Sequence, residues 1–151
     1  MNREVNGNLI RINLAESDFA IKKEDFDNAL TALKDTFSDK NFCWGNSQII
    51  TTRSTISGAF AAIGIVPIYD NEGNICNVNM YETVVDRSEY SVGDEKTFFD
   101  ALAPYVKPNS YLSFVDEDGY KWSLIFNGKE CAYSDYNDRT SFEEQYEYDF
   151  E

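Results

Sequence analysis

Residues 110–133 read SYLSFVDEDGYKWSLIFNGKECAY, and this stretch decides the fold class of the 151-residue chain. Residues 111–115 and 121–126 each alternate between two faces, which is the period of a β-strand. The dipeptides DG at 118–119 and NG at 127–128 are turn signals, because glycine adopts the positive φ that tight hairpin turns require. The stretch therefore predicts a hairpin that is followed by a short final strand.

Three segments upstream have the 3.6-residue period of amphipathic helices. They are residues 24–37, 54–63 and 92–106. Ser54 or Thr55 is placed to cap the second helix, and Pro104 should end or kink the third. The acidic pair at 94–95 lies in the first turn of the third helix, where negative charge is favourable. Residues 38–53 show no period and are predicted to form a loop that contains Cys43 and Trp44.

Further strand signals occur before and between these helices. Residues 8–14 alternate and predict a half-buried strand, with a short second strand at 18–21 after a turn. Residues 64–70 and 74–85 predict a second hairpin, in which Pro67 indicates an edge strand or a bulge.

The order of these elements defines the predicted fold class. It is β(β)ααββαβββ, which favours an α+β fold with about three helices packed on a mainly antiparallel sheet. We expect one domain over residues 1–133. Residues 134–151 are expected to form an acidic, aromatic C-terminal segment, either an edge strand or a tail.

The charge balance excludes several classes of function. Acidic residues number 27 and basic residues 13, so the net charge is −14. Such a surface repels nucleic acid and anionic membrane, because binding to either depends on Lys and Arg. It attracts basic proteins, although many acidic surfaces serve only solubility. The N-terminus has no apolar leader and the cysteines show no pairing pattern, so we expect a cytoplasmic protein.

The residue types present leave little room for catalysis. The chain has no histidine, which removes Ser–His, Cys–His and histidine-metal sites. VDEDGY at 115–120 superficially resembles a calcium loop, but its glycine comes too early and a hairpin turn fits better. The chain has no glycine-rich phosphate loop, and Cys43 lacks a visible base. The three cysteines are expected to be reduced core or near-core thiols. We therefore assign no catalytic residue, metal or cofactor.

The C-terminal segment SDYNDRTSFEEQYEYDFE, residues 134–151, combines seven acidic residues with five Tyr or Phe. Carboxylates suit a basic groove, and aromatic rings anchor protein interfaces. The residues expected to bind a partner are Asp135, Asp138, Glu143, Glu144, Tyr146, Glu147, Tyr148 and Asp149. A second interpretation has the rings packed on the domain as an edge strand while the acids remain solvated. The two interpretations are compatible.

Residues 91–130 carry a second set of motifs. They are GDE, ALAPYV, SYL, EDG, a single Trp and the FNGK turn. With these motifs the stretch resembles a group of small acidic bacterial and mobile-element proteins of unknown function. The resemblance covers about 40 residues and implies a shared fold and a bacterial or phage context. It supplies no catalytic residue and no ligand.

These observations lead to three hypotheses about function. The first is a non-enzymatic acidic protein that inhibits a basic, nucleic-acid-acting protein, such as a nuclease or a CRISPR effector, in the manner of anti-CRISPR or nuclease-immunity proteins. The second is a cytosolic ligand- or protein-binding accessory module without an inhibitory role. The third, which we rank lowest, is a carboxylate-dependent hydrolase.

Overall fold

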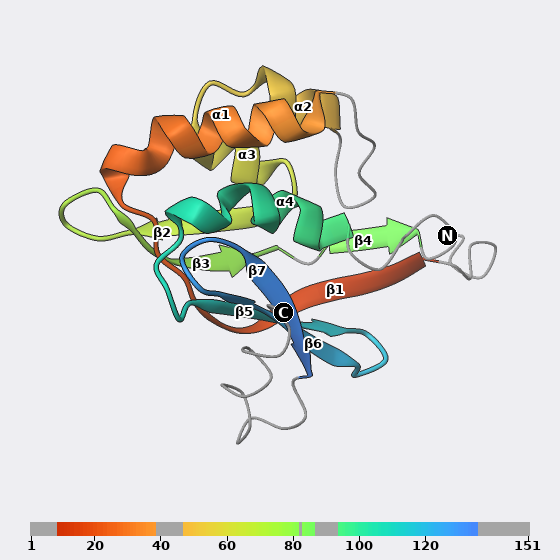
Figure 1. The fold of residues 1–151 in the computed structure, drawn as a ribbon. Helices are drawn as coiled ribbons and strands as arrows, with labels where there is room; N and C mark the ends of the chain where they lie inside the picture. The colour runs from red at the N-terminus through yellow and green to blue at the C-terminus, as the bar shows by residue number, and fades with distance from the viewer. Residues whose placement is uncertain (1–8, 39–46, 82, 87–93, 136–151) are drawn as a thin grey trace.

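The computed structural model describes residues 9–38, 47–81, 83–86 and 94–135 (Figure 1). Helices and antiparallel strands are mixed along this part of the chain, which confirms the α+β class. The elements are β1 (Leu9–Asp18), η1 (Lys23–Asp25), α1 (Phe26–Phe37), α2 (Ser47–Thr52), α3 (Ile56–Ala61), β2 (Ile65–Tyr69), β3 (Ile75–Met80), β4 (Thr83–Asp86), α4 (Asp94–Leu102), η2 (Ala103–Tyr105), β5 (Tyr111–Asp116), β6 (Lys121–Phe126) and β7 (Cys131–Asp135).

The described strands form two sheets. The larger has the order β4-β1-β5-β6-β7, and the smaller pairs β2 with β3. The predicted hairpin at 110–133 is confirmed, with Ser113 opposite Ser123 and a turn at Gly119, whose φ is 88°. The Asp116 side chain accepts the backbone N–H groups of Asp118 and Tyr120, both at 3.0 Å. The DEDG stretch is therefore a turn that is stabilised by its own first carboxylate.

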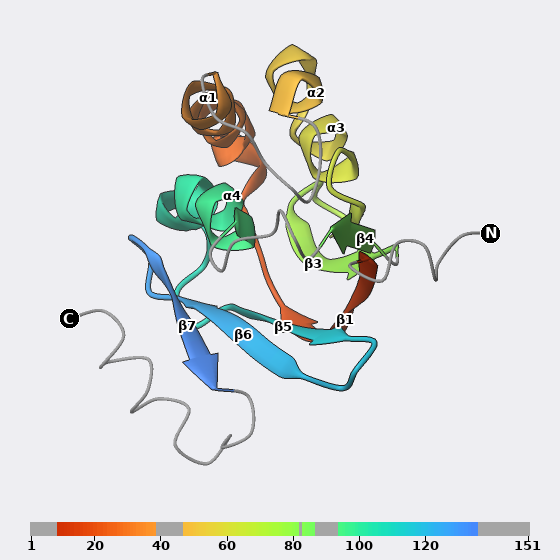
Figure 2. The ribbon, with the colours of Figure 1, turned by 90° about the vertical axis from the view of Figure 1, so that its right-hand side faces the viewer.

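The helices cover one face of the larger sheet, and the hydrophobic core lies between the two layers (Figure 2). Phenylalanines dominate this core. The ring of Phe19 makes edge contacts with Phe60 of α3, Phe99 of α4 and Phe126 of β6 at centroid distances of 6.0, 6.0 and 5.6 Å. Edge-to-face rings add about 0.5–1.5 kcal/mol per pair beyond the burial of their area. This cluster joins the helices to the sheet.

Several local predictions are confirmed. Thr55 caps α3, since its hydroxyl oxygen accepts the Gly58 N–H at 3.0 Å. Pro67 lies in β2, whose only sheet partner among the described strands is β3, and a bulge follows between Ile68 and Tyr69. Proline is tolerated there because an edge strand leaves some N–H positions unpaired.

Three predicted boundaries were wrong. Residues 47–52, expected to be loop, form the short helix α2. A turn followed by a second strand was expected at 18–21, but β1 continues to Asp18. Its last residues pair with β5 after a register shift between Leu14 and Glu16. Residues 74–85 form two strands instead of one, since β4 leaves β3 and pairs with β1.

Candidate functional site

The predicted partner-binding residues lie at and beyond the last strand. Asp135 is the final residue of β7. The other predicted positions lie outside the described residues, and they are Asp138, Glu143, Glu144, Tyr146, Glu147, Tyr148 and Asp149. Among the described strands, β7 lies at one edge of the larger sheet, so Asp135 is an edge residue. The candidate site therefore begins at this edge.

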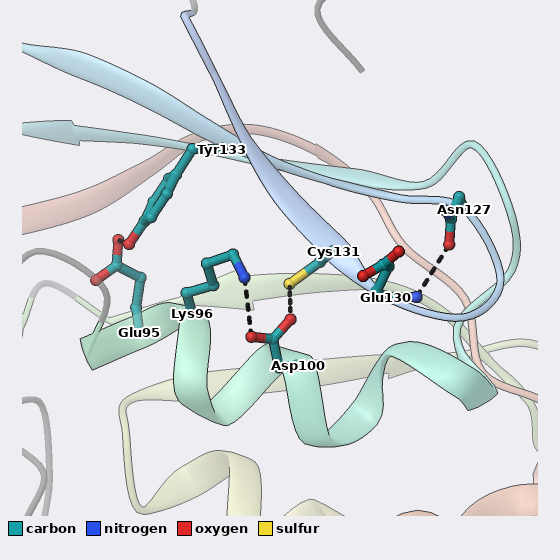
Figure 3. A network of polar contacts seen from close by, with 7 residues as sticks. All are labelled: Glu95, Lys96, Asp100, Asn127, Glu130, Cys131 and Tyr133. Carbon is teal, nitrogen blue, oxygen red and sulfur yellow. Dashed lines mark hydrogen bonds and ion pairs between the residues drawn. The ribbon is translucent and has the colours of Figure 1, made fainter. Parts of the chain in front are cut away.

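Helix α4 fixes the edge strand through a buried carboxyl group. Glu95 is 0% exposed, and one of its oxygens, Oε2, accepts the Trp122 indole N–H at 2.9 Å and the Tyr133 hydroxyl at 2.7 Å. Figure 3 shows Tyr133 of β7 pointing at Glu95 of α4. A buried carboxyl group needs such donors, because an unpaired one would lose its hydration without replacement. Glu95 thus connects α4 to the last two strands of the sheet.

A second contact joins the same helix and strand. The Lys96 Nζ lies 2.9 Å from Asp100 Oδ2, and the Cys131 thiol donates to Asp100 Oδ1 at 3.1 Å (Figure 3). Burial and the adjacent Asp100 carboxylate raise the pKa of Cys131. Burial of Lys96 opposes its charge, but the hydrogen bond and charge of Asp100 outweigh burial and raise the Lys96 pKa. The thiol is therefore held protonated, whereas a nucleophile requires a thiolate.

The contacts of Glu95 and Asp100 with the last strands were not predicted from the sequence. Glu95 was expected in the first turn of a helix, with no partner assigned to it. A signal was present, since Trp122 and Tyr133 occupy the same face of adjacent strands and both carry a polar hydrogen that needs an acceptor when buried. Without the position of α4, however, any of the 27 acidic residues could have been that acceptor.

The cysteines only partly follow the prediction of core or near-core thiols. Cys131 is buried as expected, whereas Cys76 is exposed. Cys76 has no partner residue in β2, because the register shifts there: Ile75 pairs with Tyr69 and Asn77 pairs with Ile68. Cys43, with its neighbour Trp44, lies outside the described residues.

An open depression of about 700 Å³ lies next to the β2–β3 turn and η2. Its charged lining residues are Asp18, Lys22, Glu24, Asp25, Asp70 and Lys107. Asp70 accepts the backbone N–H groups of Asn74 and Glu72, both at 2.9 Å. These hydrogen bonds, first of all that from Asn74, lower the pKa of Asp70. Asp70 therefore stabilises its own turn.

Metal-binding geometry is absent from the part of the chain that the structure describes: no three His, Cys, Asp or Glu side chains converge there. None of the helices described is both long and apolar enough to cross a membrane. Comparisons with protein-family models, curated proteins and solved structures gave no match to this chain.

Proposed function

We propose that this protein binds and inhibits a basic, nucleic-acid-acting protein and that its C-terminal acids make the contact. The observation that carries the proposal is the concentration of charge: seven of the chain's 27 acidic residues fall within its last 18 residues. This segment starts at β7, an edge strand fixed to α4 by Glu95 and Asp100. The attachment of β7 to α4 supports the proposal, because a segment that is anchored at one end loses less conformational entropy when it binds a partner.

The physical basis is competition for a groove that normally receives phosphates. Carboxylates spaced along an extended chain can pair with the Lys and Arg side chains of such a groove. Opposite charges also speed the encounter, by an amount that falls as ionic strength rises. Aromatic rings in the same segment supply apolar contact area that charge alone does not provide. A nuclease or a CRISPR effector is the expected class of partner.

The test compares two immobilised full-length chains in a nuclease-treated bacterial lysate. One is the native chain. The other carries amides at its C-terminal acids, namely Asp138→Asn, Glu143→Gln, Glu144→Gln, Glu147→Gln, Asp149→Asn and Glu151→Gln. We expect the native chain alone to retain a basic nucleic-acid-acting protein, which added DNA or RNA should displace.

The captured protein is then purified and assayed on its own nucleic-acid substrate. The native chain should inhibit it, and the amide variant should not. Equal capture by both chains, or capture without inhibition, would contradict the proposal. Inhibition should also weaken when salt is raised from about 50 to 200 mM, because competition between charged groups is screened over that range.

The second candidate function, a ligand-binding module, is favoured by the depression beside η2. Its lining includes the apolar residues Ile21, Ile75 and Val106 and the polar groups of Tyr105 and Lys107. Small-molecule sites combine apolar walls with a few polar groups in this way. A melting-temperature rise with nucleotides, amino acids or sugars that is lost in Tyr105→Ala, together with no partner capture, would favour this second function.

A further inference from the structure

Three short backbone segments lie side by side at the depression beside η2. Ile21 forms antiparallel bridges with Ile75 on one side and with Val106 on the other. Ile21 and Ile75 exchange backbone hydrogen bonds of 3.1 and 3.0 Å, and the Lys107 N–H donates to the Ala20 carbonyl at 2.9 Å. The three bridged residues are at most 2% exposed and belong to the core. The residues next to them in each segment therefore face the other way, toward the depression.

The middle segment, residues 18–22, carries a negative and a positive side chain on either side of a small residue. Phe19 and Ile21 are buried, at 0% and 1% exposure. Asp18, Ala20 and Lys22 alternate with them, and all three line the depression. Four residues of extended chain span roughly 13 Å. The two opposite charges are therefore separated by the open space that the alanine leaves between them.

A second positive side chain, that of Lys107, lies close to the first. The bridge between Ile21 and Val106 is antiparallel, so residue 107 lies opposite residue 20. Lys107 and Lys22 are therefore diagonal neighbours across two adjacent segments, with α-carbons roughly 7–8 Å apart. Both residues are exposed and both line the depression. Their long, flexible side chains can donate to the same carboxylate.

These charges are not neutralised within the part of the chain that the structure describes. Asp18, Lys22 and Lys107 have no side-chain hydrogen bond or ion pair with any described residue. Two further carboxylates, those of Glu24 and Asp25, line the same depression. A purely anionic ligand would be repelled by the three carboxylates, and a purely cationic one by the two lysines. The depression therefore favours a ligand that carries one charge of each sign.

We propose that this depression binds a short peptide with two free ends, whose carboxylate lies between Lys22 and Lys107 and whose amino group lies at Asp18. The depression measures about 700 Å³, which is within the range of small-molecule sites. Two or three extended residues, at about 3.3–3.6 Å each, fit between charges that are roughly 13 Å apart at the backbone and reach inward. This inference rests on the second candidate function, ligand binding, and is independent of the C-terminal acids.

The native Cys76 provides the readout, because it is exposed, follows Ile75 directly and lines the same depression. A peptide bound there should shield the thiol. The test measures how fast N-ethylmaleimide labels Cys76 in the full chain as trialanine is added, with site-resolved mass spectrometry to separate the three cysteines. The matched control peptide is N-acetyl-trialanine amide, which has the same length and side chains but no charged ends.

We expect saturating trialanine to slow the labelling of Cys76 at least about threefold, because a covered thiol reacts only when its cover opens. The blocked peptide should have no effect. Asp18→Asn, and Lys22→Gln with Lys107→Gln, should each raise the half-protecting concentration about twofold to fivefold, since exposed ion pairs contribute modestly. The triple variant should show no protection, and it also controls for reaction of the reagent with the peptide. Lys129→Gln, an exposed lysine outside the lining, should behave like the native chain.

Unchanged labelling with trialanine, or equal protection by the blocked peptide, would overturn the proposal. Protection that persists in the triple variant would also overturn it, as would equal protection by alanine alone, which would identify a single amino acid as the ligand. Protection by a nucleotide or a sugar but not by trialanine would contradict the peptide and leave the ligand-binding function standing. Loss of partner capture in the C-terminal amide variant bears only on the inhibitor proposal, so the two failures are distinguishable.

Discussion

Removing the hydroxyl group of Tyr133 should measurably destabilise the attachment of β7 to α4. Tyr133→Phe keeps the ring and removes only the donor that lies 2.7 Å from the fully buried Glu95 Oε2. The loss of one partner from a buried polar group costs about 1–3 kcal/mol. Trp122 still donates to the same oxygen at 2.9 Å, so we expect the lower half of this range, about 1–2 kcal/mol.

The assay is equilibrium unfolding in urea at pH 7, supported by thermal melting. For a chain of this size, the expected loss corresponds to a fall in melting temperature of roughly 2–8 °C. The matched control is Tyr120→Phe, because Tyr120 is 63% exposed and loses a solvated hydroxyl. That variant should stay within about 0.5 kcal/mol of the native chain.

A double-mutant cycle with Glu95→Met tests whether the hydrogen bond from Tyr133 to Glu95 is the cause of the lost stability. Methionine keeps a similar volume but has no carboxyl acceptor, so the Tyr133 hydroxyl loses the Glu95 oxygen as its acceptor in that background. The cost of Tyr133→Phe should then fall by at least about 0.5 kcal/mol. An unchanged cost in the Glu95→Met background, or a cost in the native background no larger than that of Tyr120→Phe, would refute the reasoning.

Three further predictions concern other parts of the fold. Because the pKa of Cys131 is raised in the folded protein, the stabilising effect of its protonated thiol is complete below about pH 9 and is lost as pH rises. Above that pH, the free energy of unfolding in urea should fall by up to about 1.4 kcal/mol per pH unit. The Cys131→Ala variant should lack this pH-dependent fall. The pKa of Asp70, followed by NMR, should lie below 3.8, because the backbone N–H groups that it accepts favour the carboxylate. Any contribution of Asp70 to the free energy of unfolding is present above pH 3.8 and disappears as pH falls through the folded pKa. Thr55→Ala should cost about 1 kcal/mol in thermal unfolding and Thr55→Ser much less, because serine retains the capping oxygen.

Much of the fold was accessible from sequence because its signals are local. The alternation within 110–133 and the two glycine turns specify β5, β6 and β7 without reference to the rest of the chain. The apolar stripe of 24–37 likewise predicts α1. Strand and helix periods are properties of a few neighbouring residues, so they survive in the sequence.

The candidate site was less accessible, for the same reason. The sequence indicated an acidic, aromatic C-terminal segment and a final strand before it, but not the position of that strand at the edge of the larger sheet. The buried Glu95 could not be distinguished from other acidic residues, because its burial depends on where α4 crosses β6 and β7. The exposed Cys76 was misassigned because regular alternation puts it on the same face as the buried Val78, whereas the strand pairing shifts register at Cys76.

The sequence by itself determined the α+β class, the two hairpins, a helix cap at Ser54 or Thr55 and the strong negative charge. Only the tertiary structure decided that β4 leaves its hairpin to pair with β1, that β1 runs on to Asp18 beside β5, and that Glu95 of α4 is buried against β6 and β7. These features arise from contacts between residues far apart in the chain. Local propensity is silent about such contacts, because the packing of whole layers decides which pairing buries the most apolar surface.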